Sequence, residues 1–388
     1  MNKGQFVIKA GGHKEDILTE SCRLPAMGGD SLEERKELMD FGVIFLSHVE
    51  SYKEAAVAES KGFTHAWFGD SQMVWADVYQ CMALCATQTK TIKLGTNVTN
   101  PSSRIAPVTA CNFATLNTLA PGRVIMGIGT GNTARRTLGM PAAKLAELRT
   151  HVDVCRGLWS GKTVPYQEGE RRRMIKFLNP DTGVINLKEP VPVFVAGSGP
   201  KTLELAGEIG DGVILFGTVG DSLLKYTLSH VRRGAERVGK RLEDLYILVL
   251  TALHFTKTGE RLADLQQAVG PLVVSECNIF ALSVTDPFQL PGDIRDDLMA
   301  FKYAYRTPNA PIETRHLDLY TDYCAEFKPE HAPLVTERMI KETTLTGTPE
   351  EIRERIRQME AMGVKQVAVA GGEPEIAEFA TQVIGKMK

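Results

Sequence analysis

Eight short apolar runs, rich in valine and isoleucine, alternate along the chain with longer segments of helical period. Nearly consecutive apolar positions of this kind are typical of strands buried on both faces, as in a parallel sheet. The pattern therefore predicts eight strands, at 41–47, 64–70, 91–98, 123–129, 191–197, 212–217, 245–251 and 365–371.

Capping signals mark several of the helices that separate these strands. Ser51 and Glu54 have the spacing of a capping box, which predicts a helix start at this point. A second capping box begins at Thr348, with a proline in the first turn, and predicts a helix that runs to about Met362. A proline in the first turn also predicts a short helix at 200–209.

Eight strands, each followed by a helix, predict an α/β fold, the (β/α)8 TIM barrel, which usually has about 250 residues. The chain has 388 residues, so we expect an N-terminal extension at 1–40 and a barrel at 41–388 with two insertions. The insertions are predicted at about 162–190 and, after the seventh strand, at about 255–345, the second with helices near 262–274, 294–305 and 316–327. A doubly wound sheet is disfavoured, because its glycine fingerprint follows the first strand, whereas the glycine-rich turns here follow the fourth and fifth.

Composition and charge narrow the class of protein. With 45 Lys+Arg against 47 Asp+Glu, the net charge is -2, which gives no basic footprint for a nucleic-acid partner. No stretch approaches the roughly 18 uninterrupted apolar residues of a membrane span, and the N-terminus lacks an apolar signal segment, so a cytoplasmic protein is expected. Seven scattered cysteines fit reduced thiols. Cys81 and Cys85 share a helix face, but no further ligand completes a metal set, so we expect core packing and no metal site.

Two glycine-rich loops lie where a TIM barrel builds its active site, at the carboxyl ends of the strands. After the fifth strand, the loop at 197–202 puts small residues before a helix N-terminus, which suits a phosphate. After the fourth strand, the loop at 129–132 leaves bare backbone and space for something large and flat. Taken alone, the first loop could be a tight strand-to-helix turn and the second could be barrel-mouth packing without a ligand, but together they favour a shared phosphate-bearing cofactor. The candidate contacts are Gly129, Thr130, Gly131, Asn132, Gly197, Ser198, Gly199, Pro200, Lys201 and Thr202, with Gly217 and Thr218 after the sixth strand.

Candidate catalytic groups are fewer. Asp70 ends the second strand and is a plausible proton carrier, although an aspartate there could equally cap the next helix. His48 follows the first strand near the barrel mouth, where a histidine is more often solvent-exposed than catalytic. His254 at the end of the seventh strand has the same two interpretations. The run 171–173 of three arginines could reach an acidic cofactor tail, although a solvated hairpin face is the usual explanation.

The end of the third strand carries small and amide residues. Asn97, Val98 and Asn100 precede or flank Pro101, and this composition favours a kink or bulge. Taken alone, the segment is better explained as a structural turn than as a ligand contact.

Five segments of the chain resemble the bacterial luciferase-like family of flavin- and deazaflavin-dependent oxidoreductases. Within that family they are similar to the branch that contains methylene-tetrahydromethanopterin reductase. The resemblance implies a TIM barrel with a reduced flavin or deazaflavin across the strand C-termini and its phosphate beside the two glycine-rich loops. It also implies a non-proline cis peptide at Asn97-Val98, behind the isoalloxazine ring. The segments are 69–79, 92–104, 121–134, 193–217 and 346–369.

One departure from the family pattern affects function. True luciferases and many alkane or sulfonate monooxygenases of this family have a histidine just after the second strand, where this chain has Asp70-Ser71-Gln72. The resemblance therefore does not carry their hydroperoxide-stabilising chemistry over to this chain.

Three functional hypotheses follow. The first is a two-component monooxygenase, in which FMN reduced by a separate NAD(P)H-dependent flavin reductase reacts with O₂ and a small organic substrate is oxidised, with Asp70 and His48 as the expected catalytic groups. The second is a coenzyme F420-dependent reductase or dehydrogenase that transfers a hydride without oxygen. The third is a non-catalytic flavin-binding protein. FMN is preferred only because it is available in most organisms, and the resemblance further implies a homodimer.

Overall fold

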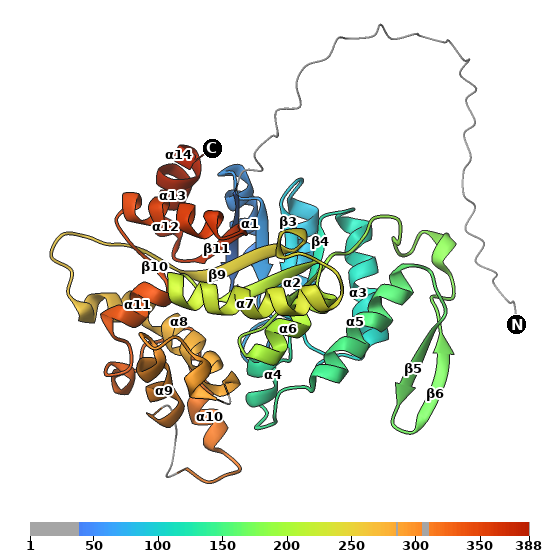
Figure 1. Ribbon diagram of the computed structural model, residues 1–388. Helices are drawn as coiled ribbons and strands as arrows, with labels where there is room; N and C mark the ends of the chain where they lie inside the picture. Colours follow the sequence, from blue (N-terminus) through green and yellow to red (C-terminus); the bar gives the residue numbers. More distant parts are fainter. Residues whose placement is uncertain (1–38, 285, 305–309, 388) are drawn as a thin grey trace, which may run out of the picture. The chain divides into compact units, whose positions relative to one another are not determined.

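Eight parallel strands close into a barrel surrounded by helices (Figure 1). The computed structural model describes residues 39–284, 286–304 and 310–387, so nearly all of the predicted N-terminal extension lies outside the described residues. Each barrel strand pairs in parallel with the next, and the last pairs with the first. The predicted TIM barrel and its eight strands are therefore confirmed. The strands are β1 (Asp40–Phe45), β2 (His65–Phe68), β3 (Lys93–Thr96), β4 (Val124–Ile128), β7 (Val193–Ala196), β8 (Gly212–Phe216), β9 (Tyr246–Phe255) and β11 (Val364–Ala370).

Large apolar side chains fill the interior of the barrel, because alternate residues of each strand point inward. Trp67 of β2 is fully buried there and packs near Phe194 of β7, with ring centroids 5.9 Å apart. Gly95 of β3 makes room for the indole, since a Cβ at that position would lie 2.3 Å from a Trp67 ring carbon. The interior cluster is Trp67, Ile125, Phe194, Ile214, Leu248, Leu250 and Ala368.

The helices cover the outside of the barrel with their apolar faces. At the predicted capping box of Thr348, the backbone N–H of this residue donates to Glu351 at 2.8 Å and the hydroxyl of Thr348 accepts from the Glu351 N–H at 3.3 Å. The capping box predicted at Ser51 is wrong, because Ser51 is the first helical residue and its hydroxyl accepts from the His48 N–H instead. The helices are α1 (Ser51–Ser60), α2 (Val78–Gln88), α3 (Ala106–Leu119), α4 (Asn132–Arg136), α5 (Leu145–Trp159), α6 (Pro200–Ile209), α7 (Asp221–Arg237), α12 (Pro349–Ala361), α13 (Glu373–Phe379), a π-helical turn η5 (Ala380–Ile384) and α14 (Gly385–Met387).

Two segments extend the barrel where insertions are expected. Within 162–190, an antiparallel hairpin of β5 (Val164–Glu168) and β6 (Arg171–Ile175) lies beside α5 (Figure 1). After β9, a helical segment packs around its own apolar cluster and returns through β10 (Leu345–Gly347), which pairs with the end of β9. Its helices are α8 (Leu262–Ser283), α9 (Arg295–Ala304), α10 (Arg315–Tyr320) and α11 (Glu337–Thr343).

The helical insertion differs from its prediction in three places. Helix α8 continues past its predicted end to Ser283 and accommodates Pro271, because its buried apolar stripe continues on both sides of the proline. Helix α10 ends seven residues before its predicted end, and Asp322 beyond it has a φ of +59°, which no right-handed helix accepts. Helix α11 has no counterpart among the predicted helices.

No helix in the described part of the chain is both long enough and apolar enough to cross a membrane. The expected cytoplasmic location stays a prediction.

Candidate active site

A cavity of about 470 Å³ lies over the carboxyl ends of the barrel strands, where this fold places active sites. The barrel provides one wall through the loops after β2, β3, β4 and β7. The helical insertion provides the facing wall through α8 and the segment after α10. Polar or glycine positions of the barrel wall are Gly69, Asp70, Ser71, Asn97, Gly129, Thr130, Gly131, Asn132, Thr133, Arg136, Lys144, Gly197, Ser198, Thr202 and Thr251, and the insertion contributes Leu272, Ser275, Glu276, Ile279, Leu282, Ser283, Tyr323 and Cys324.

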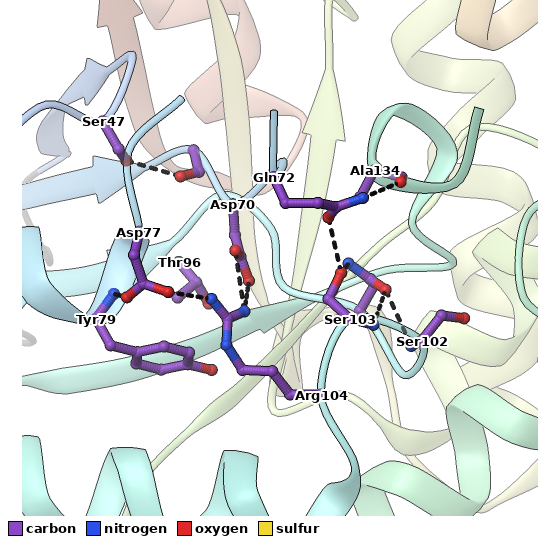
Figure 2. Close-up of polar contacts among 12 residues, drawn as sticks. Ser47, Asp70, Gln72, Asp77, Tyr79, Thr96, Ser102, Ser103, Arg104 and Ala134 are labelled. Atoms are coloured by element: carbon purple, nitrogen blue, oxygen red, sulfur yellow. Dashed lines mark hydrogen bonds and ion pairs between the residues drawn. The ribbon is translucent and has the colours of Figure 1, made fainter. Parts of the chain in front are cut away.

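Asp70 reaches the cavity from the loop after β2 and is held by a cation. Arg104 donates from Nη1 to both carboxylate oxygens of Asp70, at 3.1 and 2.9 Å, and from Nη2 to Asp77 at 2.7 Å (Figure 2). The guanidinium also lies 4.6 Å from the centre of the Tyr79 ring, a cation–π geometry. Asp70 is therefore fixed in orientation by a charged network that begins outside the cavity.

Burial and the nearby positive charge shift the pKa of Asp70 in opposite directions. Only 5% of its side chain is exposed. Burial raises the pKa of the Asp70 carboxyl above its usual range, although the positive charge of Arg104 opposes that shift. The expected alternative role, capping of the following helix, belongs to Asp77, whose Oδ1 accepts from the N–H groups of Tyr79 and Gln80.

The end of β3 contains the cis peptide that the family resemblance implies, between Asn97 and Val98. Both residues line the cavity. Asn100 does not line it: the Oδ1 atom accepts from the N–H groups of Ser102 and Ser103 at 3.0 Å each, so the interpretation as a structural turn fits this residue.

The loop after β4 presents backbone and one unpaired donor. Gly131 has a φ of +74°, and a Cβ there would lie 2.8 Å from Asn100, so only glycine fits. Asn132 accepts from the Arg136 Nε at 2.6 Å, whereas its buried Nδ2 has no partner among the described residues. This amide and the backbone of Gly129 and Thr130 suit a polar ligand at the cavity wall.

The loop after β7 is divided between the cavity and the protein interior. The residues Gly197, Ser198 and Thr202 line the cavity. Their contact with a cofactor phosphate remains a prediction. Gly199 instead faces α8, because a Cβ on it would lie 2.6 Å from the Ser283 carbonyl oxygen. Lys201 is exposed on α6 and, like Pro200, does not line the cavity.

Gly217 and Thr218 lie beside the cavity wall rather than in it. Gly217 has a φ of +58° and packs against the carboxyl group of Glu276, to which a Cβ would approach within 2.3 Å. Thr218 is buried, and its hydroxyl has no partner among the described residues. Neither residue lines the cavity, so the structure does not bring them together with the other predicted cofactor contacts.

The two histidines near the barrel mouth lie in a different pocket. His48 is about half exposed and approaches Glu54 at 3.3 Å. His254 is buried and contacts Glu260 at 3.1 Å. Both line a pocket of about 810 Å³ over β1 and β9, not the cavity that contains Asp70. A catalytic role for His48 stays a prediction that the geometry does not support.

Other side chains that the sequence singled out lie away from the cavity lining. Cys81 and Cys85 are buried in the apolar core of α2, as expected. No group of three metal-ligating side chains occurs among the residues that the structure describes. The arginines at 171–173 lie exposed on the hairpin strand β6, away from the cavity lining.

Four charged residues in or beside the cavity were not predicted: Arg104, Arg136, Lys144 and Glu276. Arg104 ends a segment that carries the family resemblance, but its contacts with Asp70 and Asp77 join residues 34 and 27 positions apart, which no local pattern reveals. Glu276 had a detectable signal: it is the only charged residue between Asp264 and the end of α8 at Ser283, in an otherwise apolar stretch. A lone carboxylate within such a stretch indicates a buried polar function.

The barrel and its polar, glycine-lined cavity define a TIM-barrel protein with an enzyme-like site at the strand C-termini. The chain belongs to the luciferase-like monooxygenase family, whose model matches residues 39–366. It is thus a member of a family of oxidoreductases.

The chain is similar to known relatives in this family. The chain is 26% identical over 353 residues to the 5,10-methylenetetrahydromethanopterin reductase of Archaeoglobus fulgidus, covering 90% of this chain and 98% of the relative. It is 33% identical over 221 residues to an F420-dependent glucose-6-phosphate dehydrogenase of Nakamurella multipartita, covering 53% of this chain and 64% of the relative.

Solved structures share the fold. The coenzyme F420-dependent tetrahydromethanopterin reductase of Methanopyrus kandleri superposes with a TM-score of 0.65 at 21% identity, over 90% of this chain and 100% of that one. A monooxygenase of Streptomyces bottropensis superposes with a TM-score of 0.58 at 18% identity, also over 90% and 100%.

Proposed function

We propose that this protein is a coenzyme F420-dependent oxidoreductase that transfers a hydride to or from a carbon atom of a small organic substrate. The observation that carries the proposal is the nearly full-length similarity to a methylenetetrahydromethanopterin reductase, together with F420-dependent relatives at higher identity over shorter segments. The FMN-dependent monooxygenase, preferred on the sequence alone, has support only from the family description and from distant structures.

The residues that line the cavity fit such a cofactor. Apolar side chains of Val98, Ile214 and Phe216 offer faces for a flat ring, and the unpartnered Asn132 amide offers a donor. The backbone at 129–130 and the residues Ser198 and Thr202 would hold the phosphate. When bound, the deazaflavin supplies or accepts the hydride. The protein contributes orientation, exclusion of water and a place for the accompanying proton.

The side chains that line the cavity also favour hydride transfer over oxygen chemistry. Among the described residues that line the cavity there is no histidine, and Asp70 is engaged by Arg104. The imidazole that many family monooxygenases place after the second strand thus has no equivalent in this cavity. Hydride transfer needs neither O₂ nor a separate flavin reductase, and these partners remain predictions attached to the FMN alternative. The homodimer, which the family resemblance implies, also remains a prediction.

Anaerobic titration with coenzyme F420 and, separately, with FMN tests the proposal. We expect F420 to bind tightly and its reduced form to show no oxygen consumption beyond the free cofactor on admission of air. Arg171→Ala, on the exposed hairpin, serves as a matched surface control and should bind F420 as the natural protein does. Tight binding of reduced FMN with substrate-dependent oxygen uptake would support the monooxygenase instead, and binding of neither would overturn both.

A further inference from the structure

Glu276 lies in the insertion wall of the cavity, and both of its carboxyl oxygens are buried. It lies in the middle of α8, only 3% of the residue is exposed, and it lines the same cavity as Asp70 and Val98. Neither carboxyl oxygen has a hydrogen-bond partner among the residues that the structure describes. A buried carboxyl group without partners is costly, so its retention at a cavity wall needs a function.

The position of this carboxyl group is fixed by its packing. It lies against the backbone of Gly217, where a Cβ would approach the carboxyl oxygen Oε2 within 2.3 Å. Gly217 has a φ of +58°, so the turn after β8 can adopt this shape with glycine at little cost. The turn and the helix together hold the carboxyl group at the edge of the cavity.

Among the described residues, the charged side chains that line the cavity together with Glu276 are Asp70, Arg136 and Lys144 of the barrel wall. Tyr323 and Cys324, from the segment after α10, line the insertion wall, and burial raises the pKa of each, that of Cys324 to about 12. The Tyr323 hydroxyl accepts from Ser275 at 2.5 Å. On α8 itself burial raises the pKa of Cys277 well above its usual range, and both Glu276 and, from α9, Asp297 act in the same direction.

Asp70 and Glu276 are therefore two buried carboxyl groups at the wall of one cavity, and only Asp70 has a cation beside it. Burial affects both, but Arg104 opposes its effect at Asp70, whereas burial alone acts on Glu276 and raises its pKa well above the usual range. Sites that separate two carboxyl groups in this way commonly use one as a fixed charge and the other as a proton carrier.

We propose that Glu276 is the proton donor and acceptor for a substrate whose reacting carbon is doubly bonded to oxygen or nitrogen. This inference rests on the proposed hydride-transfer function. As the carbon receives the hydride, its π-bond pair moves onto the heteroatom, which takes the proton from Glu276 and leaves a carboxylate. The proton lost on oxidation of the cofactor goes to solvent, and solvent returns one to Glu276. In the reverse direction the carboxylate takes the proton of an alcohol or amine.

The substrate class follows from this chemistry. A carbonyl compound or imine has a lone pair that accepts the proton, and its reduced partner is an alcohol or amine. An isolated carbon–carbon double bond has no such atom and would not use Glu276.

The first test uses the full-length protein without any cofactor. Infrared spectra in H₂O and D₂O should contain the C=O band of a protonated carboxylic acid near neutral pH, and the band should be absent in Glu276→Gln. Asp70→Asn and Glu342→Gln serve as controls that keep the band. Glu342 is the closest match, because it also packs against a glycine of the β8–α7 turn, Gly220, and burial raises its pKa, but it does not line the cavity. Absence of a band that depends on Glu276 would overturn the proposal whichever cofactor binds.

The second test follows F420 reduction with propan-2-ol, cyclohexanol and benzylamine as probes. Glu276→Gln should lower the turnover of an accepted probe roughly a hundredfold or more with unchanged F420 affinity, and should remove one limb of the pH–rate profile. Glu342→Gln should retain activity. Turnover of Glu276→Gln within a few-fold of the natural protein would overturn the proton-transfer role, and acceptance of none of the probes would overturn the substrate class. If the protein shows the infrared band but binds no F420, the proposed hydride-transfer function fails while the protonated state of Glu276 stands. Failure of the proposed function can thus be distinguished from failure of the inference about Glu276.

Discussion

Arg104 donates two hydrogen bonds from one nitrogen to Asp70, at 3.1 and 2.9 Å (Figure 2). The pair connects the loop after β3 to the loop after β2. Because 18% of the arginine side chain and 5% of the aspartate side chain are exposed, solvent screens the pair only weakly. Among the described residues, Asp70 is the one carboxylate of the barrel wall that lines the cavity, and the contact with Arg104 positions it.

Replacement of Arg104 by methionine should therefore be strongly destabilising. It leaves Asp70 buried beside the cavity without its cation, and loss of one partner from a buried pair costs about 3 kcal/mol. Urea unfolding at pH 7 measures the change in the free energy of unfolding. The double variant Arg104→Met with Asp70→Asn should recover much of the loss, because no uncompensated charge remains; equal losses in the single and double variants would contradict the account.

Asp77 has two separable roles, which two substitutions distinguish. One oxygen caps α2 and the other accepts from Arg104. Asp77→Asn keeps a capping oxygen but loses the charge, whereas Asp77→Ala loses both and should cost about 1 kcal/mol more. Urea unfolding of the two variants gives the difference, and equal stabilities would show that the cap contributes nothing.

The glycine of the β4 loop is required for more than its backbone conformation. Gly131→Ala introduces both a positive-φ strain of about 1 kcal/mol and a contact of 2.8 Å with buried Asn100. Gly161 has a φ of +70° with nothing near its Cβ position, so Gly161→Ala measures the strain alone. We expect Gly131→Ala to lose about 1–3 kcal/mol more in urea unfolding. Equal losses would mean that Asn100 yields without cost.

Glu59 makes the stability of the barrel sensitive to acid. Partial burial acts to raise its pKa, but hydrogen bonds from the N–H groups of Ile92, Thr91 and Lys90 outweigh this and lower the pKa to about 2, from 4.5. A carboxyl group with a lowered folded-state pKa contributes stability above its unfolded pKa, and that contribution is lost as the pH falls through the folded value.

Glu59→Gln should consequently be less stable than the natural protein at pH 7. The difference between the two proteins should shrink as the pH falls from about 4.5 to about 2, where Glu59 becomes protonated. Unfolding followed by circular dichroism across this range provides the measurement. A difference that is constant with pH would show that the carboxylate charge is not involved.

The sequence was sufficient for the barrel because its signals are local. Each strand is a short apolar run, and the helix from Thr348 carries its own capping signals, so both could be recognised without knowledge of distant residues. The loops at 129–132 and 197–202 were recognised because glycine, which lacks a Cβ, permits backbone conformations and close approaches that other residues do not. The sequence could not reveal what each glycine contacts. Gly199 lies against the Ser283 carbonyl oxygen of α8 and does not line the cavity.

The parts that escaped prediction depend on contacts between distant segments. Arg104 is an unremarkable loop arginine until folding brings Asp70 and Asp77 to it. His48 was placed near the barrel mouth from its position after β1, but its side chain lies in the neighbouring pocket beside Glu54. The insertion wall was expected as helices, yet which of their faces meets the cavity is decided by how α8 packs against β9 and α11.

The insertion begins and ends at one point of the barrel. Strand β9 extends to Phe255, and β10 returns beside it with Gly347 opposite Phe255 and Leu345 opposite Leu253. Because the two ends are hydrogen-bonded neighbours, the intervening chain can change in length at a small cost in loop-closure entropy. The segment between the two strands could therefore be replaced as a unit, in evolution or by protein engineering. Such a replacement would change the insertion wall of the cavity and leave the register of the barrel strands, which build the other wall, unaltered.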